Sequence, residues 1–212
     1  MTEKFAGERM AGYDSSHDWW HIERVRKIAK YINEQESLAD PFTLEVATLL
    51  HDTVDSKFNT GDSVEVYKSV KEFLDQIGLD NIKDQVIEVI RNVSFSNKNP
   101  SGNLRNPVLL VLQDADKIDA LGAIGIARAF TYGGFRNNAI YIPGGFHNGK
   151  GKSTIGHFYD KLLNLKDMMN TPTGRRIAEE RHLFLKKYLE QFYKEWNFVL
   201  RILLCVVSFN VL

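Results

Sequence analysis

The pair of residues best suited to chemistry is His51-Asp52, which directly follows the apolar segment 41–50. Pro41 suits the first turn of a helix, and the apolar residues behind it predict a helix that ends at the pair. At a helix end, an imidazole and the next carboxylate can reach one point in space, and both are good ligands for Zn, Mn, Fe or Co. Taken alone, the dipeptide is more typical of a histidine favoured by the helix dipole beside a loop aspartate.

Other potential ligands lie on two further apolar segments. His17 and His21 are four residues apart, hence on one face of a predicted helix. Asp114, Asp116 and Asp119 fall within six residues, directly after the run VLLVLQ. Charge on so apolar a helix is costly unless it is paired or bound to metal, although Asp114 or Asp119 could instead face water. Facing helices build metal sites in bundles, so these segments are expected to converge.

Apolar residues recur with helical periodicity in nearly all of the segments that could position these side chains. The expected helices span residues 17–36, 41–50, 63–77, 81–93, 107–122, 123–132, 153–170 and 173–196, after a short helix or arm at 1–16. The apolar run 108–112 would also suit a buried strand, but the spacing that follows it favours a helix. No pair of alternating strands around a turn is present. The sequence therefore predicts an all-α bundle of about seven to nine helices.

Composition narrows the class of protein. The chain has 212 residues, of which 27 are basic and 27 acidic, so no net field attracts a nucleic-acid polymer or a membrane surface. Cys205 is the single cysteine, which rules out an internal disulfide and a Cys-rich zinc site. The N-terminus lacks the apolar core of a signal peptide. We therefore expect a cytoplasmic protein, and a homodimer is the default oligomer on frequency alone.

The chain divides into one expected domain, residues 1–197, and an apolar tail, residues 198–212. The tail reads FVLRILLCVVSFNVL and is more apolar than anything before it. It is shorter than the roughly 20 residues that a spanning helix needs, and Arg201 interrupts it. It is not interpreted as a membrane anchor, and its role is left open.

The order His, then His-Asp, then Asp resembles the HD-domain metal-dependent phosphohydrolase superfamily. The stretches HDWWHIERV, LLHDTVDSKF, QDADKIDALGAIGIARAF and HFYDKLLNLKDMMNT look like its small single-domain bacterial members. The resemblance implies an HD-domain helical bundle, with His21, His51, Asp52 and Asp116 binding one divalent metal. Asp116 is preferred among its neighbours because the family motif reads Ala-Asp-Lys/Arg-aliphatic. Manganese is the first choice of metal, with Mg, Co, Fe, Ni or Zn as alternatives.

Such a metal leaves coordination positions open and lowers the pKa of a bound water to about 7. Besides Asp52, Asp55 is expected to orient the attacking water or act as general base, unless it merely caps the turn. Cations should surround the metal to hold phosphate. Arg24 lies one helical turn beyond the first ligand, Lys57 lies in the loop after the His-Asp pair, and Lys117 follows the last ligand.

Two further candidates for substrate contact lie on a later segment. The resemblance places His157 and Lys161, which are four apart, over the active site as phosphate or leaving-group contacts; an exposed helical face is the alternative. His147 lies in a glycine-rich loop, where a lid role lacks support.

Trp19 and Trp20 could stack on a base, but such residues more commonly anchor the packing of helices.

These residues favour a metal-dependent phosphohydrolase acting on nucleotides, with release of pyrophosphate from a nucleoside or deoxynucleoside triphosphate as the first hypothesis. A 5′-nucleotidase or a phosphodiesterase is the alternative within the enzyme class. A metal- and nucleotide-binding module without turnover is the alternative outside it. A purely structural helical protein would require the acidic cluster to be accidental.

Overall fold

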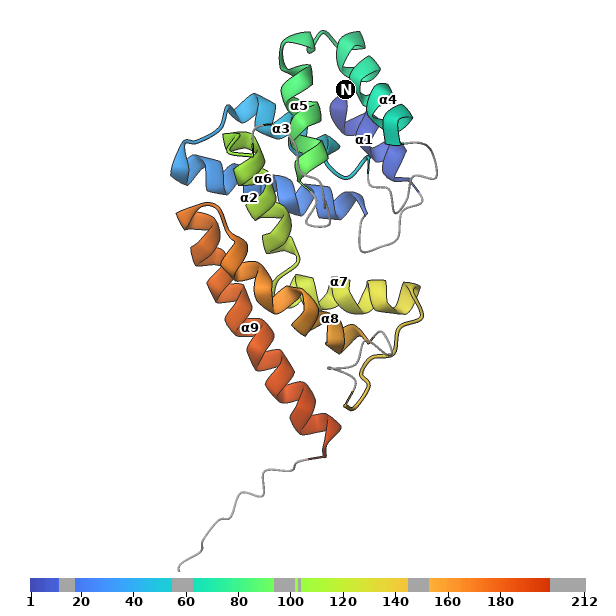
Figure 1. Ribbon diagram of the computed structural model, residues 1–212, viewed down its shortest axis with the longest axis vertical. Coiled ribbons are helices and arrows are strands. Elements are labelled where there is room, and N and C mark those ends of the chain that lie inside the picture. The colour runs from blue at the N-terminus through green and yellow to red at the C-terminus, as the bar shows by residue number, and fades with distance from the viewer. Residues whose placement is uncertain (12–17, 55–62, 94–101, 103, 145–152, 199–212) are drawn as a thin grey trace, which may run out of the picture.

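A computed structural model of the chain describes residues 1–11, 18–54, 63–93, 102, 104–144 and 153–198 (Figure 1). Within these ranges the chain forms nine α-helices, one 3-10 helix (η2) and no β-strand, apart from an isolated bridge between Ala139 and Ser153. The elements are α1 (Thr2–Met10), α2 (Trp19–Glu36), α3 (Pro41–Leu50), α4 (Ser63–Gln76), α5 (Asp80–Asn92), α6 (Pro107–Asp119), α7 (Gly122–Phe135), α8 (Thr154–Asp160), η2 (Leu162–Met168) and α9 (Pro172–Trp196). The predicted all-α fold is confirmed.

Helix α2 has a defined start and a defined end. The carboxylate of Asp18, which lies in extended backbone, accepts a hydrogen bond from the backbone N–H of His21 at 3.0 Å. This N-cap satisfies a donor that the first turn of a helix leaves without an intrahelical partner. Ser37 ends the helix in the left-handed region at φ 52°, where its N–H bonds the carbonyl of Asn33. The cap therefore places His21 in the first turn of α2.

The His51-Asp52 pair lies in the turn that directly follows helix α3. Asp40 caps the start of α3 by accepting from the backbone N–H and the hydroxyl of Thr43, each at 2.7 Å. After Leu50 the chain leaves the helix in a turn, in which the backbone N–H and hydroxyl of Thr53 both donate to the Leu50 carbonyl. This local bonding holds His51 and its neighbour immediately after the last residue of α3.

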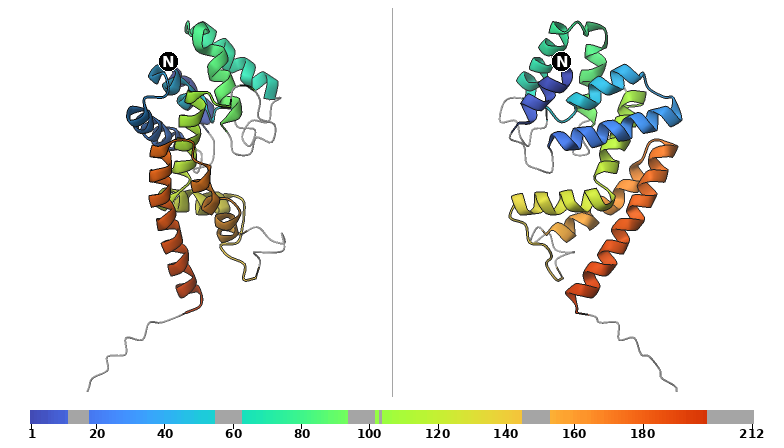
Figure 2. Two further views of the ribbon diagram at one scale, coloured as in Figure 1. Left: turned by 60° about the vertical axis from the view of Figure 1, so that its left-hand side comes forward. Right: turned by 180° about the vertical axis from the view of Figure 1, so that it is seen from behind.

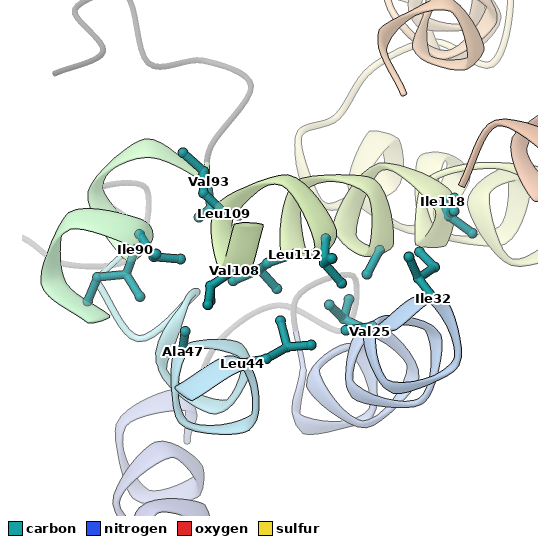
Figure 3. Packing of buried hydrophobic residues seen from close by; sticks show 14 of the residues in the cluster. Val25, Ile32, Leu44, Ala47, Ile90, Val93, Val108, Leu109, Leu112 and Ile118 are labelled. Atoms are coloured by element: carbon teal, nitrogen blue, oxygen red, sulfur yellow. The ribbon is translucent and has the colours of Figure 1, made fainter. Parts of the chain in front are cut away.

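Helix α6 forms the centre of the hydrophobic core. It packs against α2, α3, α5, α7 and α9, and Figure 3 shows its apolar side chains meeting those of α2, α3 and α5. The labelled residues, all buried, are Val25, Ile32, Leu44, Ala47, Ile90, Val93, Val108, Leu109, Leu112 and Ile118. Full burial of one such side chain stabilises the fold by about 1.5–3 kcal/mol. The acidic residues at the end of α6 therefore belong to a helix that packs against α2, α3, α5, α7 and α9.

The later helices α7, α8 and α9 form a second group, and α6 leads from the α1–α5 group into it (Figures 1 and 2). Gly122 begins α7 with φ 71°, a conformation that favours glycine. A Cβ at Gly122 would lie 3.1 Å from the side chain of Arg181 on α9. Arg181 also donates to the carbonyl of Ile118 at 2.8 Å. This contact fixes α9 against the C-terminal end of α6.

One predicted helix, residues 153–170, is in fact two elements. Lys161 separates α8 from η2 with φ −136° and ψ −60°. The side-chain amide of Asn164 lies 3.2 Å from the carbonyl of Tyr159 and 3.5 Å from that of Asp160. Hydrogen bonds from a side chain to nearby carbonyls compete with the backbone bonds that would continue the helix. The periodicity of apolar residues does not reveal such bonds, so the break was not predicted.

In the part of the chain that the structure describes, no helix is long and apolar enough to cross a membrane. Helix α9 ends at Trp196, and residues 199–212 of the tail lie outside the described part of the chain. The domain boundary at 197, the cytoplasmic location and the homodimer stay predictions from the sequence.

Candidate metal centre

The turn after α3 holds His51 in one orientation. Its Nδ1 lies 2.7 Å from the carbonyl oxygen of Thr48, which can only accept, so Nδ1 carries the proton and donates. In a neutral imidazole the lone pair is then on Nε2. This Nε2 is buried 3.6 Å from Asp52 Oδ1 and has no hydrogen-bond partner among the described residues. A buried acceptor of this kind is costly, and a cation would satisfy it.

His21 approaches the same carboxylate from α2. Its Nε2 lies 3.2 Å from Asp52 Oδ2 and 3.5 Å from Asp116 Oδ1, while its Nδ1 lies 2.8 Å from Asp119 Oδ2. The rings of His21 and His51 have centroids 5.4 Å apart with planes inclined at 63°. Asp52 therefore lies next to the Nε2 atoms of both imidazoles.

Together these residues form a compact set of donor atoms. One atom from each of His21, His51 and Asp52 lies within 4.8 Å of the others, and Asp116 adds an oxygen beside His21. The imidazole side chains are 1% exposed, whereas those of Asp52 and Asp116 are 16% and 29% exposed. The histidines are thus the most buried members of the set, and Asp116 is the most exposed.

The donor set fits a divalent metal. Two neutral imidazole nitrogens and two carboxylates offer four ligands and two negative charges, a combination used for zinc, manganese, iron and cobalt. Burial and the charge on Arg128 lower the pKa of His21, but its hydrogen bonds to Asp119 and Asp52 outweigh them, so that the pKa lies above its ordinary value. A proton and a cation therefore compete for this imidazole.

Asp119, the last residue of α6, connects His21 to two arginines. Its Oδ1 lies 2.8 Å from Arg24 Nε on α2, and its Oδ2 lies 3.1 Å from Arg24 Nη2 and 3.0 Å from Arg128 Nη1 on α7. Burial would raise the pKa of the Asp119 carboxyl, but the hydrogen bonds from His21 and Arg24 hold it well below its usual range. Asp119 is therefore an ionised carboxylate in the interior, paired with cations from two other helices.

The sequence signal for this second group of residues was weak. The alternative that Asp119 or Asp114 faces water is wrong, because both side chains are buried, at 1% and 0% exposed. Arg128 was not singled out by its residue type. It does lie within the stretch QDADKIDALGAIGIARAF on which the family resemblance rests, which is the one signal that could have found it.

Comparisons with known proteins agree with this geometry. The family model described as the HD domain matches residues 19–121, the span from the start of α2 to just past α6. Protein YpgQ of Bacillus subtilis is 42% identical over 190 residues, which cover 85% of this chain and 85% of that protein. The chain belongs to the HD-domain family.

Solved structures resemble this HD-domain chain over nearly its whole length. The crystal structure of YpgQ in complex with ADP has a TM-score of 0.74 at 36% identity, and the match covers 92% of this chain and 97% of that one. An HD-superfamily hydrolase from Bacillus thuringiensis has a TM-score of 0.73 at 37% identity, covering 92% and 95%. The chain is therefore a phosphohydrolase of the HD superfamily, and the prediction that it is an enzyme is confirmed.

Three other residues of this HD-domain protein are predicted to contact substrate. One of them lies on α6 and two lie on or next to α8. Lys117 is 8% exposed, and its Nζ donates to the carbonyl of Met168 at 3.3 Å. Burial lowers the pKa of Lys117. His157 is on the exposed side of α8, and Lys161 follows that helix. Helix α8 packs against α7 and η2, in the second group of helices (Figure 1).

Other predicted residues lie outside the described part of the chain. They are His17, Asp55, Lys57 and His147.

Trp19 and Trp20, which precede His21, are both described but differ in their exposure. Trp19 packs as predicted against Met10, Ile22 and Leu49, whereas Trp20 is 66% exposed, so the packing interpretation is wrong for Trp20.

Proposed function

We propose that this HD-domain hydrolase cleaves nucleoside or deoxynucleoside triphosphates with release of pyrophosphate, using one divalent ion, manganese foremost. The observation that carries the proposal is the convergence of two oriented imidazoles on Asp52, where the buried Nε2 of His51 has no hydrogen-bond partner among the described residues. A nucleotide substrate is supported by the relative YpgQ, whose crystal structure is a complex with ADP.

His21, His51, Asp52 and Asp116 would hold the metal. A bound divalent cation lowers the pKa of water towards about 7 and polarises a phosphoryl oxygen. The two imidazoles are oriented by hydrogen bonds from Nδ1, so each ring in its neutral form has the lone pair of Nε2 on the side of Asp52. The partly exposed side chains of Asp52 and Asp116 mark the side from which a phosphate would enter.

Cations near this donor set would bind the phosphates. Arg24 contacts Asp119 through Nε and Nη2, and its side chain is still 30% exposed, so its outer edge is available to a phosphate oxygen. We also propose substrate contacts for Lys117, which follows the ligand Asp116, and for His157 and Lys161, as the family resemblance implies.

The segment after the His51-Asp52 turn would supply further groups. Asp55 and Lys57 follow Val54, the last described residue of that turn, within three residues. For Asp55, which follows Asp52 by three residues in the sequence, we propose orientation or deprotonation of the attacking water, since a carboxylate can accept its proton. For Lys57 we propose a contact with a phosphate, as a point charge.

Product analysis tests this function. Metal-stripped protein is incubated with a panel of dNTPs, NTPs and nucleoside monophosphates, with and without Mn²⁺, and the products are separated by chromatography. We expect nucleoside monophosphate and pyrophosphate, formed only when metal is added. Asp116→Ala is expected to lose both metal content and activity while its circular dichroism stays that of the parent helices.

Other products would contradict the proposal in defined ways. Nucleoside and orthophosphate from the monophosphates would make the protein a nucleotidase. Absence of product from every substrate, with about one metal still bound per chain, would leave a binding module. Full activity in Asp116→Ala would overturn the ligand assignment.

A further inference from the structure

Asp119 lies on the opposite side of the His21 ring from the donor set. Its Oδ2 is 2.8 Å from Nδ1 of His21, whereas Nε2 of the same ring is 3.2 Å from Asp52 and 3.5 Å from Asp116. The two nitrogens of an imidazole point away from each other. Asp119 is therefore placed to act on a ligand rather than to be one.

The contact decides which nitrogen of His21 carries the proton. An ionised carboxylate can only accept, so Nδ1 must donate to it. In the neutral ring this leaves the lone pair on Nε2, the atom that faces Asp52. A ligand histidine is commonly oriented by such a carboxylate, and loss of that partner weakens metal binding.

Two arginines keep the Asp119 carboxylate in place. Arg24 forms a two-point contact with both oxygens, and Arg128 contacts Oδ2 from another helix. A bidentate guanidinium contact fixes the plane of a carboxylate as well as its position. Because Asp119 is 1% exposed, its charge needs these partners to be stable in the interior.

We propose that Asp119 is a positioning residue for the metal centre, which fixes the His21 ring so that Nε2 faces the other ligands. Arg24 and Arg128 hold its carboxylate for this task. The inference rests on the proposed metal site, and it adds a residue outside the predicted ligand set.

The experiment compares two buried aspartates of the same helix. Asp119→Asn keeps the shape of the side chain but removes its charge. Asp114→Asn is the matched control, because Asp114 is equally buried on α6 but contacts Asn170 and Thr171. The dissociation constant for Mn²⁺ is measured by competition with a chromogenic chelator. The visible spectrum of the Co²⁺-loaded protein reports on the ligand geometry.

We expect Asp119→Asn to weaken Mn²⁺ binding by about 10- to 100-fold and to alter the Co²⁺ spectrum. Asp114→Asn should leave both within about twofold of the parent, because its contacts support packing rather than a ligand. Unchanged affinity in Asp119→Asn would overturn the inference, and so would an equal loss in both variants. A parent protein that binds no divalent ion would instead overturn the metal site itself.

A second variant covers the case in which Asp119→Asn does not fold. Arg128→Gln removes one anchor of Asp119 from α7 and leaves every proposed ligand intact. A several-fold loss of Mn²⁺ affinity with a native circular dichroism spectrum is the expected result. Parent-like affinity in this folded variant would overturn the inference.

Discussion

Asp114 on α6 accepts hydrogen bonds from both the backbone N–H and the hydroxyl of Thr171, each at 2.8 Å, across 57 residues of sequence. The same carboxylate accepts from the backbone N–H of Asn170. Thr171 in turn caps α9 by accepting from Gly174. A Cβ at Gly174 would lie 2.3 Å from Asp114, so the approach is close. Asp114 therefore ties the start of α9 to the helix that carries Asp116.

Asp114→Ala should destabilise the fold by about 3 kcal/mol, since it leaves several buried donors without an acceptor. Urea unfolding followed by circular dichroism measures the loss. Asp167→Ala is the surface control, because the Asp167 side chain is 72% exposed, and its effect should stay within about 0.5 kcal/mol. Equal stability of the two variants would show that the Asp114 contacts do not hold α9 in place.

Metal removal should lower the melting temperature of the protein. A ligand present at about 100 times its dissociation constant stabilises the native state by about 2.7 kcal/mol. For a chain of this size that corresponds to a shift of roughly 5–10 °C. Scanning fluorimetry with and without Mn²⁺ measures the shift.

His51→Ala is the control for the metal shift, because it removes the buried Nε2 that has no hydrogen-bond partner among the described residues. Mn²⁺ should change its melting temperature little. A shift of the same size in His51→Ala and the parent would place the ion elsewhere.

The Asp40 cap should make stability depend on pH. Hydrogen bonds from the hydroxyl and then the backbone N–H of Thr43 lower the pKa of Asp40. A lowered native-state pKa adds stability above the unfolded pKa, about 3.9 for aspartate, and that stability is lost as the pH falls through the native value. Asp40→Asn keeps a capping acceptor that does not titrate.

The measurement is urea unfolding of Asp40→Asn and of the parent over a pH series. The difference between them should be constant near neutrality and should change only below about pH 4. A difference that stays flat down to about pH 3 would mean that the charge of Asp40 is not linked to folding.

The acidic end of α6 shows how far the site could be predicted. Asp114, Asp116 and Asp119 share one residue type and lie within six residues, so no local rule separates them. The family motif favoured Asp116 as the ligand, and its carboxylate does lie beside His21. The roles of Asp114 and Asp119 depend on contacts with Thr171 and His21, which lie far away in the sequence. The periodicity of apolar residues does not predict contacts of this kind.

The all-α class, most helix bounds and the family membership followed from sequence alone. Helix-start residues, apolar periodicity and short motifs are local properties, so Pro41 and the His51-Asp52 pair could be recognised without a fold. Tertiary packing decided the direction of the His21 imidazole, the burial of Asp119 and the contact that Arg128 on α7 makes with it. These contacts depend on how helices far apart in sequence pack together, because the cost of a buried charge is offset only by the partners that packing brings.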